Sequence, residues 1–482
     1  RMLWDQNGIA PSGQELPGRI FTQAEIDAAL ARPDPYAALG YLPWENGYEA
    51  PDAVRTPMSE LVRQTQVHGT HVLSVAGGRR PAQGLWAGPV QPGVAPGAAL
   101  AFVHLRPRAL ISEGDAIDVF EGVCALFAFA RQEDMPAVIN LSIGANTGAH
   151  DGRGLMDRAF DALLQVPGRA ITVAAGNART TSQHWNGKVA PGQPATFGWR
   201  FAGGDRTPNV LRVYAPMQGR RPPLDIAIGR PGGSPDSVLP PNALRRRDVD
   251  RLLDAKGEAI IGTAVSTTHP FSTEEVLQHF EIRLAPAGSD ETWQVTLSLD
   301  PKATPAEIAF DAWIERDDLR RQDSSRFEPL SGASVTEGCT LGSLACAAGP
   351  ICVAAHDLPG GASAVFSSRG PTRAGAEKPD VAAPGVNIRA AAGRGGQLDG
   401  SGMPFDVTWL MNGTSAAAPH VAGVVALMLQ ARPNLSTTRI RAILQATTRE
   451  RQHDAAAAWV PDLGCGRVDA AAALAKTLEE PV

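Results

Sequence analysis

The sequence has few cysteines, few aromatic residues and no long hydrophobic run. No uninterrupted apolar segment approaches the 18 residues that a membrane span needs, the longest candidate being 421–429, so we expect no membrane partner. The 482 residues include 44 basic and 50 acidic side chains, for a formal net charge of −6. Nucleic-acid binding needs a concentrated basic face. The one basic cluster, 245–247, is followed directly by Asp248, so we interpret it as a solvated face and expect no nucleic-acid partner.

Five cysteines spread over this length do not form a disulfide framework, and their odd number leaves at least one thiol unpaired. This favours a reducing compartment and hence a cytoplasmic location. Cys339, Cys346 and Cys352 lie close together in the sequence with His356 nearby, a composition that raises the question of zinc. The spacing lacks a Cys-x-x-Cys knuckle, and the small apolar neighbours are typical of buried strand thiols. We therefore expect no metal there.

From about residue 92 to 177, short apolar runs alternate with helical periodicity. Ile117, Phe120, Cys124 and Phe127 follow the spacing i, i+3, i+7 and i+10, which predicts one buried helix face. Strand, helix, strand, helix, strand is typical of right-handed βαβ units, so we predict a mostly parallel sheet flanked by helices. The strands are expected at 98–105, 137–143 and 170–174, and a second helix at about 155–164.

Beyond about residue 197, six short segments show period-two alternation and are separated by Gly, Pro, Asp and Ser turns. In one of them Trp293, Val295, Leu297 and Leu299 would point to the same side. These segments predict a jelly-roll-like β-sandwich inserted in the α/β domain. The expected division is 1–197 for the first part of the α/β domain, 198–335 for the insertion and 336–482 for the second part, which ends in helices at 415–430 and 436–447.

Three segments place a reactive side chain among small residues. VHGTHVLSVAGG has His68 ahead of small residues that can start a helix, ITVAAGNA has Asn177 just past a strand, and MNGTSAAAPHVAG has Ser415 at a helix start, with Pro419 expected in its first turn. A serine nucleophile needs a neighbouring base, which histidine supplies near neutral pH. An asparagine amide and the serine N–H can stabilise the oxyanion that follows, helped by the helix dipole.

Each of these residues also has an ordinary interpretation. Taken singly, His68 fits a surface or cap histidine, Ser415 an N-cap serine and Asn177 a turn residue. His68 and His71 form an i, i+3 pair that suggests a metal, but no third ligand is nearby. The joint occurrence of the three segments favours the catalytic interpretation.

At these residues the chain resembles the subtilisin-like serine proteases, the subtilases. HGTHV, AAGN and NGTSAAAPHVAG match the family's histidine, oxyanion-asparagine and serine motifs in chain order, and the likeness extends over about 60–200 and 335–475. The resemblance implies that His68 is the general base and acid, Ser415 the nucleophile and Asn177 the side-chain half of the oxyanion hole. It also implies a peptide or protein substrate that pairs with an edge strand. The substrate-binding residues that it implies are Leu141, Ser142, Ile143, Gly144, Ala175 and Gly176.

No cofactor is required for this chemistry. Structural calcium is common in the family, but no carboxylate loop in this chain is specific enough to assign, and the sequence does not indicate an oligomeric state.

The acid of the triad is the open point. Asp5 follows an apolar stretch, but Gln6 and Asn7 stand where the family has Thr or Ser and then Gly. The chain most resembles the bacterial subtilases with a β-rich insertion, like the clostridial spore-germination subtilases, in which a strand similar to RMLWDQ comes after the catalytic-acid strand. On this alignment the acid lies upstream of Arg1, where we expect a further segment. Asp5 as the acid and a naturally acid-less protein stay open as alternatives.

The predicted function is therefore a serine endopeptidase that works through an acyl-enzyme intermediate. The alternative is a pseudoprotease or regulatory peptide-binding protein with a degenerate triad.

Overall fold

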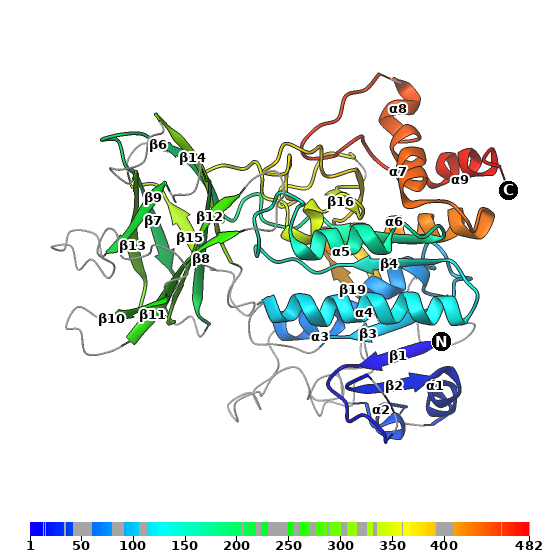
Figure 1. Ribbon diagram of the computed structural model, residues 1–482. Helices are drawn as coiled ribbons and strands as arrows, with labels where there is room; N and C mark the ends of the chain where they lie inside the picture. Colours follow the sequence, from blue (N-terminus) through cyan, green and yellow to red (C-terminus); the bar gives the residue numbers. More distant parts are fainter. Residues whose placement is uncertain are drawn as a thin grey trace.

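The protein consists of an α/β region and a β-rich region that lie side by side (Figure 1). The computed structural model describes residues 1–12, 14, 16–32, 35–41, 60–79, 91–105, 113–203, 207–217, 223–229, 249–253, 260–269, 276–286, 289–299, 306–315, 325–330, 335–358, 360–391, 408–454 and 456–481. The basic cluster at 245–247 lies outside the described residues.

The α/β region is built on a parallel sheet with the strand order β17-β16-β5-β4. Its strands are β4 (Ala137–Leu141), β5 (Arg169–Ala174), β16 (Ile351–His356) and β17 (Val381–Pro384). Successive residues of a strand face opposite sides, and here both sides are covered. Ala170 and Ala174 pack with helix α6 (Thr414–Ala431), whereas Ile171 and Val173 pack with α4 (Glu113–Gln132) and α5 (Leu155–Leu163). The predicted parallel sheet between helices is confirmed.

A second sheet has the order β2-β1-β3, with β1 antiparallel to β2 and parallel to β3. Its strands are β1 (Met2–Asp5), β2 (Arg19–Thr22) and β3 (Ala101–His104), accompanied by α1 (Gln23–Leu30), α2 (Pro35–Leu39) and α3 (Glu60–Gly77). Among the described strands, β3 and β4 each stand at the edge of their own sheet, and α4 packs on both. All four residues of β3 are partly exposed, whereas β16 is buried throughout.

The insertion is a sandwich of two antiparallel sheets, with strand orders β10-β11-β12-β8-β14-β6 and β15-β7-β13-β9. One apolar core lies between them, and Trp293, Val295 and Leu297 point into it as predicted. The sandwich begins at β6, before the boundary predicted at 198, because β6 and β7 already contribute Trp185 and Phe197 to this core. Its strands are β6 (His184–Val189), β7 (Ala195–Phe201), β8 (Asn209–Pro216), β9 (Leu224–Gly229), β10 (Val249–Leu253), β11 (Ile260–His269), β12 (Leu277–Leu284), β13 (Glu291–Leu299), β14 (Ile308–Ile314) and β15 (Arg326–Glu328).

Two local predictions are wrong. Ile117 is 59% exposed, because the buried stripe of α4 is Val119, Val123 and Phe127, with spacing i, i+4 and i+8. Pro419 lies in the second turn of α6 and not in the first, since the helix begins at Thr414.

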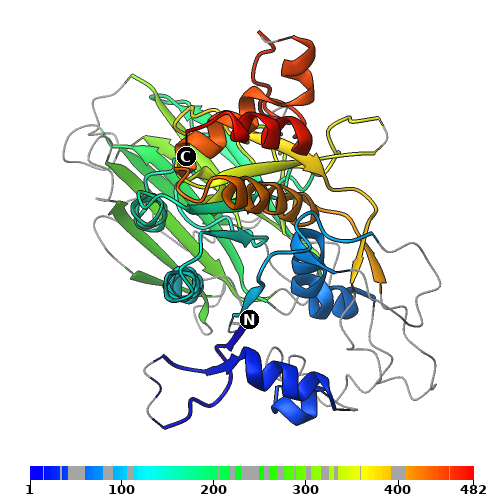
Figure 2. The same ribbon diagram turned by 90° about the vertical axis from the view of Figure 1, so that its right-hand side faces the viewer.

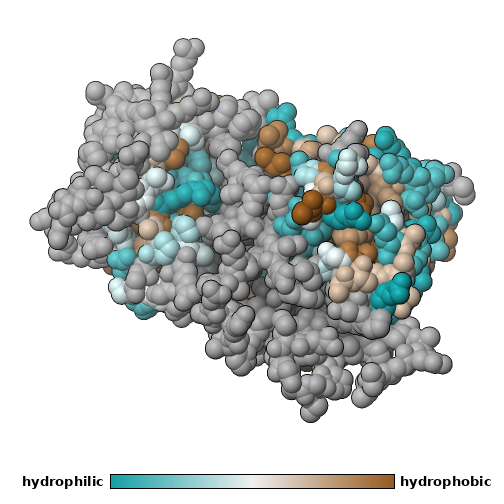
Figure 3. Space-filling model, turned by 90° about the horizontal axis from the view of Figure 1, so that it is seen from below, coloured by the Kyte–Doolittle hydropathy of each residue, from teal (hydrophilic) through white to brown (hydrophobic). Residues whose placement is uncertain are grey.

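The remaining elements all follow the insertion in the chain. They are η2 (Ser343–Cys346), β18 (Ile388–Ala391), β19 (Thr408–Met411), α7 (Thr437–Ala446), α8 (Arg449–His453) and α9 (Ala470–Leu478). The Ser436 side chain caps α7, where a helix was predicted. Among the described helices, α6 is the one that is long and apolar enough to cross a membrane, and it is mostly buried in the core. On the face shown in Figure 3, apolar groups are interspersed with hydrophilic ones.

Candidate active site

Ser415 is the second residue of α6, which begins at Thr414 directly after Gly413. Gly413 has φ 153° and ψ 157°, a conformation that is essentially restricted to glycine. The N–H groups of a first helical turn have no acceptor within the helix, and they carry the positive end of the helix dipole. The Ser415 hydroxyl lies 3.4 Å from the carbonyl oxygen of Ser142 and donates to it. The predicted nucleophile is therefore placed where a developing negative charge is favoured.

Asn177 follows the end of β5 and is held by the start of α6. Its Oδ1 accepts hydrogen bonds from the Thr414 backbone N–H at 2.9 Å and from the Thr414 hydroxyl at 3.0 Å. A Cβ atom built on Gly413 would lie 3.2 Å from Asn177 Nδ2 and 3.6 Å from the Ser415 backbone N. Asn177 Nδ2 and the Ser415 backbone nitrogen therefore lie near the same point at the start of α6, and amide N–H groups of this kind are the donors that an oxyanion hole uses.

Gly176 brings Asn177 into this position. Its φ is 110°, and a Cβ atom there would lie 2.8 Å from Ser368 Oγ. The Gly176 N–H donates to Thr414 Oγ1 at 3.1 Å, and its carbonyl accepts from the Ser368 N–H at 2.9 Å. A side chain at this position would separate the strand end from the helix start.

His68 lies within α3, which begins earlier than predicted, and its side chain is partly exposed. Helix α3 packs against α6, and Figure 2 shows the two helices next to each other. A Cβ atom on Gly69 would lie 2.7 Å from the Phe102 ring, so glycine allows α3 to approach β3. His71 Nε2 lies 2.9 Å from the carbonyl oxygen of Ile388. Among the described residues, no group of three or more His, Cys, Asp or Glu side chains is placed to hold a metal ion.

The proposed substrate strand continues β4, which is at one edge of its sheet among the described strands. The Asn140 amide donates to Ser142 Oγ at 2.9 Å, and that hydroxyl donates to the carbonyl oxygen of Ser415 at 2.9 Å. In a regular helix the Ser415 carbonyl would accept from the residue four positions later, but that residue is Pro419, which has no N–H. Pro419 therefore leaves the carbonyl open to Ser142, and the bond ties the nucleophile helix to the substrate strand.

Gly144 and Gly176 both lie next to Gly342, a residue that the sequence did not indicate. A Cβ atom on Gly342 would lie 3.8 Å from the Gly144 Cα, and one on Gly176 would lie 3.3 Å from the Gly342 N. The Gly342 N–H donates to the carbonyl oxygen of Ala175 at 2.9 Å. The segment after the insertion therefore borders the predicted pocket. No local pattern around Gly342 indicates this, because the contact exists only in the folded chain.

Asp5 is buried at the end of β1, where its backbone is paired in register with His104. Its Oδ1 accepts from the Asn7 backbone N–H at 3.0 Å and lies 3.3 Å from His104 Nδ1. Burial by itself would raise the pKa of Asp5, but the hydrogen bonds from His104 and Asn7 hold it below its usual value. Asp5 therefore belongs to the β2-β1-β3 sheet and not to the sheet that carries Asn177.

A nucleophile at a helix start, opposite an amide donor at the end of a parallel strand, is the arrangement of subtilisin-like hydrolases. The family model described as "Subtilase family" matches residues 45–466, and the chain belongs to this family.

Similar proteins come from bacteria and plants. Serine protease AprX of Bacillus subtilis is 42% identical over 88 residues, which are 18% of this chain and 20% of AprX. Subtilisin-like protease SBT1.2 of Arabidopsis thaliana is 43% identical over 90 residues, or 17% of this chain and 11% of that protein. The match thus spans a fifth or less of these relatives. The solved structure of the Clostridium perfringens CspB protease covers 99% of this chain and 87% of its own, with a TM-score of 0.71 and 21% identity, and shows the same fold.

Proposed function

We propose that the protein is a serine endopeptidase that hydrolyses peptide bonds of protein substrates through an acyl-enzyme intermediate. Ser415 Oγ attacks the carbonyl carbon, while His68 takes the hydroxyl proton and returns it to the leaving amine. Asn177 Nδ2 and the Ser415 N–H stabilise the oxyanion. The observation that carries this proposal is that Asn177 Nδ2 and the Ser415 backbone nitrogen lie near one point at the start of the helix that carries the nucleophile. No cofactor takes part in the chemical step.

An extended peptide would bind by pairing with residues 141–144, at the end of β4 and just beyond it. Main-chain hydrogen bonds would supply affinity, and the pocket bordered by Gly144 and Gly176 would receive the side chain before the scissile bond. A Cβ atom on Gly144 would meet no atom of the described residues within 4 Å, which leaves room beside Gly144 for a substrate.

A fluorophosphonate probe on the full-length protein tests the nucleophile. Wild type should be labelled and Ser415→Ala should not. Ser436→Ala is the matched control, because Ser436 also stands at a helix N-terminus but caps α7, away from Asn177. Equal labelling of wild type and Ser415→Ala would refute the proposal.

For the triad acid, we propose a carboxylate on a strand that precedes Arg1 in the full-length protein and lies between β3 and β4. The support is topological, since β3 and β4 are edge strands of separate sheets and both lie under α4. A strand between them would join the two sheets. Asp5→Asn tests whether Asp5 is the acid instead: loss of a triad aspartate lowers turnover by about 10⁴, so a labelling rate within a few-fold of wild type would exclude Asp5. A loss of that size would identify Asp5 as the acid.

A second candidate is a pseudoprotease or regulatory protein that binds peptides without efficient turnover. The observation that favours it is that Asp5, the acid in the apolar strand before His68, is engaged by Asn7 and His104. Peptide binding by full-length wild type without measurable hydrolysis or labelling would favour this candidate.

A further inference from the structure

We propose that Glu315 of the inserted sandwich is a positioning residue for the substrate strand, and that it sets the orientation in which an extended peptide can pair with residues 141–144. This inference rests on the proposed function of that strand. It gives the insertion a direct role in peptide binding, since Glu315 directly follows β14 and reaches the catalytic region from there.

The contact is made by Asn146, two residues past Gly144. The Asn146 backbone N–H donates to Glu315 Oε1 at 2.9 Å. Its side-chain amide donates to the carbonyl oxygen of Ile314, also at 2.9 Å. Both bonds are buried, and both acceptors lie at the same end of β14.

The same peptide group is held from its other side. The carbonyl oxygen of Ala145 accepts from the Ser343 backbone N–H at 2.8 Å and from the Ser343 hydroxyl at 3.0 Å. The Ala145 carbonyl and the Asn146 N–H belong to one peptide unit, and a peptide unit is planar. Fixing both of its polar atoms fixes the plane between Ala145 and Asn146, and this anchors the chain directly after Gly144.

Glu315 is itself held rigidly by the sandwich. Its side chain is 2% exposed, and Oε2 accepts from Arg212 Nη1 at 2.9 Å. Arg212 also bonds Glu281 at 2.8 Å, and the Glu315 backbone N–H donates to the carbonyl oxygen of Val210 at 2.8 Å. The Glu315 side chain is therefore anchored to the sandwich through Arg212.

An aromatic contact holds the next part of the segment. The rings of His150 and Trp313 stack at 4.2 Å with an angle of 9°, and Trp313 Nε1 donates to the carbonyl oxygen of Cys339 at 3.2 Å. The end of β14 therefore contacts the chain after the substrate strand at both Asn146 and His150. If Glu315 only joined the sandwich to the catalytic region, removing either carboxylate partner of Arg212 would change peptide binding equally. A positioning role predicts an effect for Glu315 and none for Glu281.

The experiment compares Glu315→Ala with Glu281→Ala in full-length Ser415→Ala protein. Both substitutions remove one carboxylate partner of Arg212, but only Glu315 bonds Asn146. The probes are fluorescein-labelled Ala₂ and Ala₄ peptides, because polyalanine presents main chain with minimal side chains, and binding is followed by anisotropy. We expect the tighter binding of Ala₄ over Ala₂ to fall roughly five- to tenfold in Glu315→Ala, the effect of losing one ordinary hydrogen bond, and to be retained in Glu281→Ala.

Three results would overturn the inference. They are equal losses of the Ala₄ preference in the two variants, an unchanged ratio of Ala₄ to Ala₂ affinity in Glu315→Ala, and the absence of any preference for Ala₄ in all three proteins. If thermal unfolding shows that Glu315→Ala does not fold, Glu315→Asp decides the question by the same Ala₄-to-Ala₂ affinity ratio, because it keeps the carboxylate but shortens the side chain that reaches Asn146. These measurements need no turnover. Absence of hydrolysis by wild type would refute the proposed function and leave the Glu315 comparison standing.

Discussion

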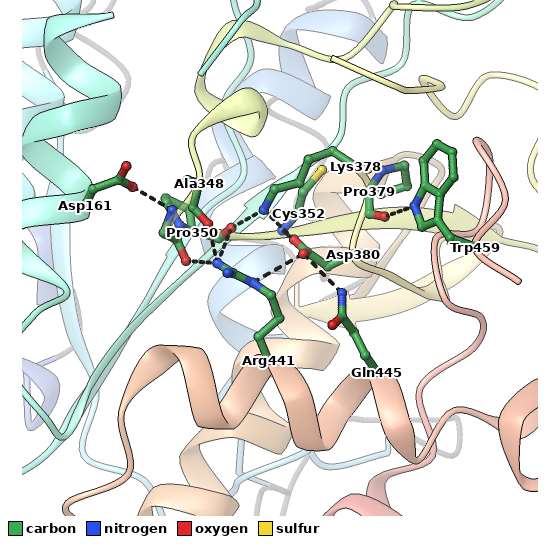
Figure 4. Close-up of polar contacts among 11 residues, drawn as sticks. Asp161, Ala348, Pro350, Cys352, Lys378, Pro379, Asp380, Arg441, Gln445 and Trp459 are labelled. Atoms are coloured by element: carbon green, nitrogen blue, oxygen red, sulfur yellow. Dashed lines mark hydrogen bonds and ion pairs between the residues drawn. The ribbon is translucent and has the colours of Figure 1, made fainter. Parts of the chain in front are cut away.

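The buried ion pair between Lys378 and Asp380 provides a sharp test of how this fold is stabilised. Figure 4 shows the polar side chains that converge on Asp380. Lys378 Nζ lies 2.6 Å from Asp380 Oδ2, the Cys352 backbone N–H donates to the same oxygen at 2.7 Å, and Arg441 Nε lies 3.2 Å from Oδ1. Lys378 and Asp380 side chains are 6% and 3% exposed. The network connects the ends of β16 and β17 to α7.

Substituting Asp380→Asn keeps the side-chain volume but leaves the Lys378 charge buried without its anion. Breaking a buried pair in this way costs about 3–5 kcal/mol, a large part of the roughly 5–15 kcal/mol by which a folded protein is stable. The matched control is Glu479→Gln. The Lys476–Glu479 pair has the same 2.6 Å separation, but its side chains are 44% and 63% exposed. Such i, i+3 pairs contribute about 0.2–0.5 kcal/mol.

Urea unfolding monitored by intrinsic fluorescence measures both variants, with the midpoint and slope giving the change in free energy of unfolding. We expect Asp380→Asn to lose several times more stability than Glu479→Gln. Similar losses of stability in the two variants would contradict this reasoning. They would mean that the distance between the charged atoms, and not their burial, determines how much an ion pair contributes to stability.

Three further predictions concern the site and its surroundings. Burial lowers the pKa of His150 from 6.5 to about 4, so between these values the unfolded chain binds more protons and stability falls as the pH drops. We expect His150 to lower the free energy of unfolding by about 2 kcal/mol between pH 7.5 and pH 5. His150→Gln should remove this part of the pH dependence, which urea unfolding at the two pH values measures. Gly413→Ala places a Cβ 3.2 Å from Asn177 Nδ2, where it would displace the amide. Fluorophosphonate labelling should then slow by roughly 10²–10³, the general magnitude for losing one oxyanion donor in this family. Pro419→Ala supplies an N–H that competes with Ser142 for the Ser415 carbonyl, so stability measured by urea should rise, by up to about 3 kcal/mol, while the labelling rate falls.

Much of the fold could be predicted because its patterns are local. The strand 291–299 alternates large apolar and polar residues, and those apolar residues do face the sandwich core. The helix after Gly413 starts where small residues and a serine indicate it. By contrast, β6 carries a glycine and a lysine among its apolar residues, so its place in the sandwich became visible only through its pairing with β14.

The orientation of α4 shows why a local pattern is insufficient. Ile117 and Val119 are both apolar, and the choice between them depends on the sheet that the helix covers. The same holds for Pro419, whose missing N–H becomes meaningful once Ser142 lies opposite Ser415.

The sequence by itself determined the family, the identity of His68, Asn177 and Ser415 as site residues to be tested, and the alternation of sheet and helix, because each depends on a short stretch of neighbouring residues. Tertiary structure alone decided that Asn177 and the Ser415 N–H border one point, that Asp5 pairs with His104, and that Glu315 contacts Asn146. These contacts join residues far apart in the chain, in the last case by 169 positions. Their geometry depends on how strands and helices pack, which no local pattern encodes.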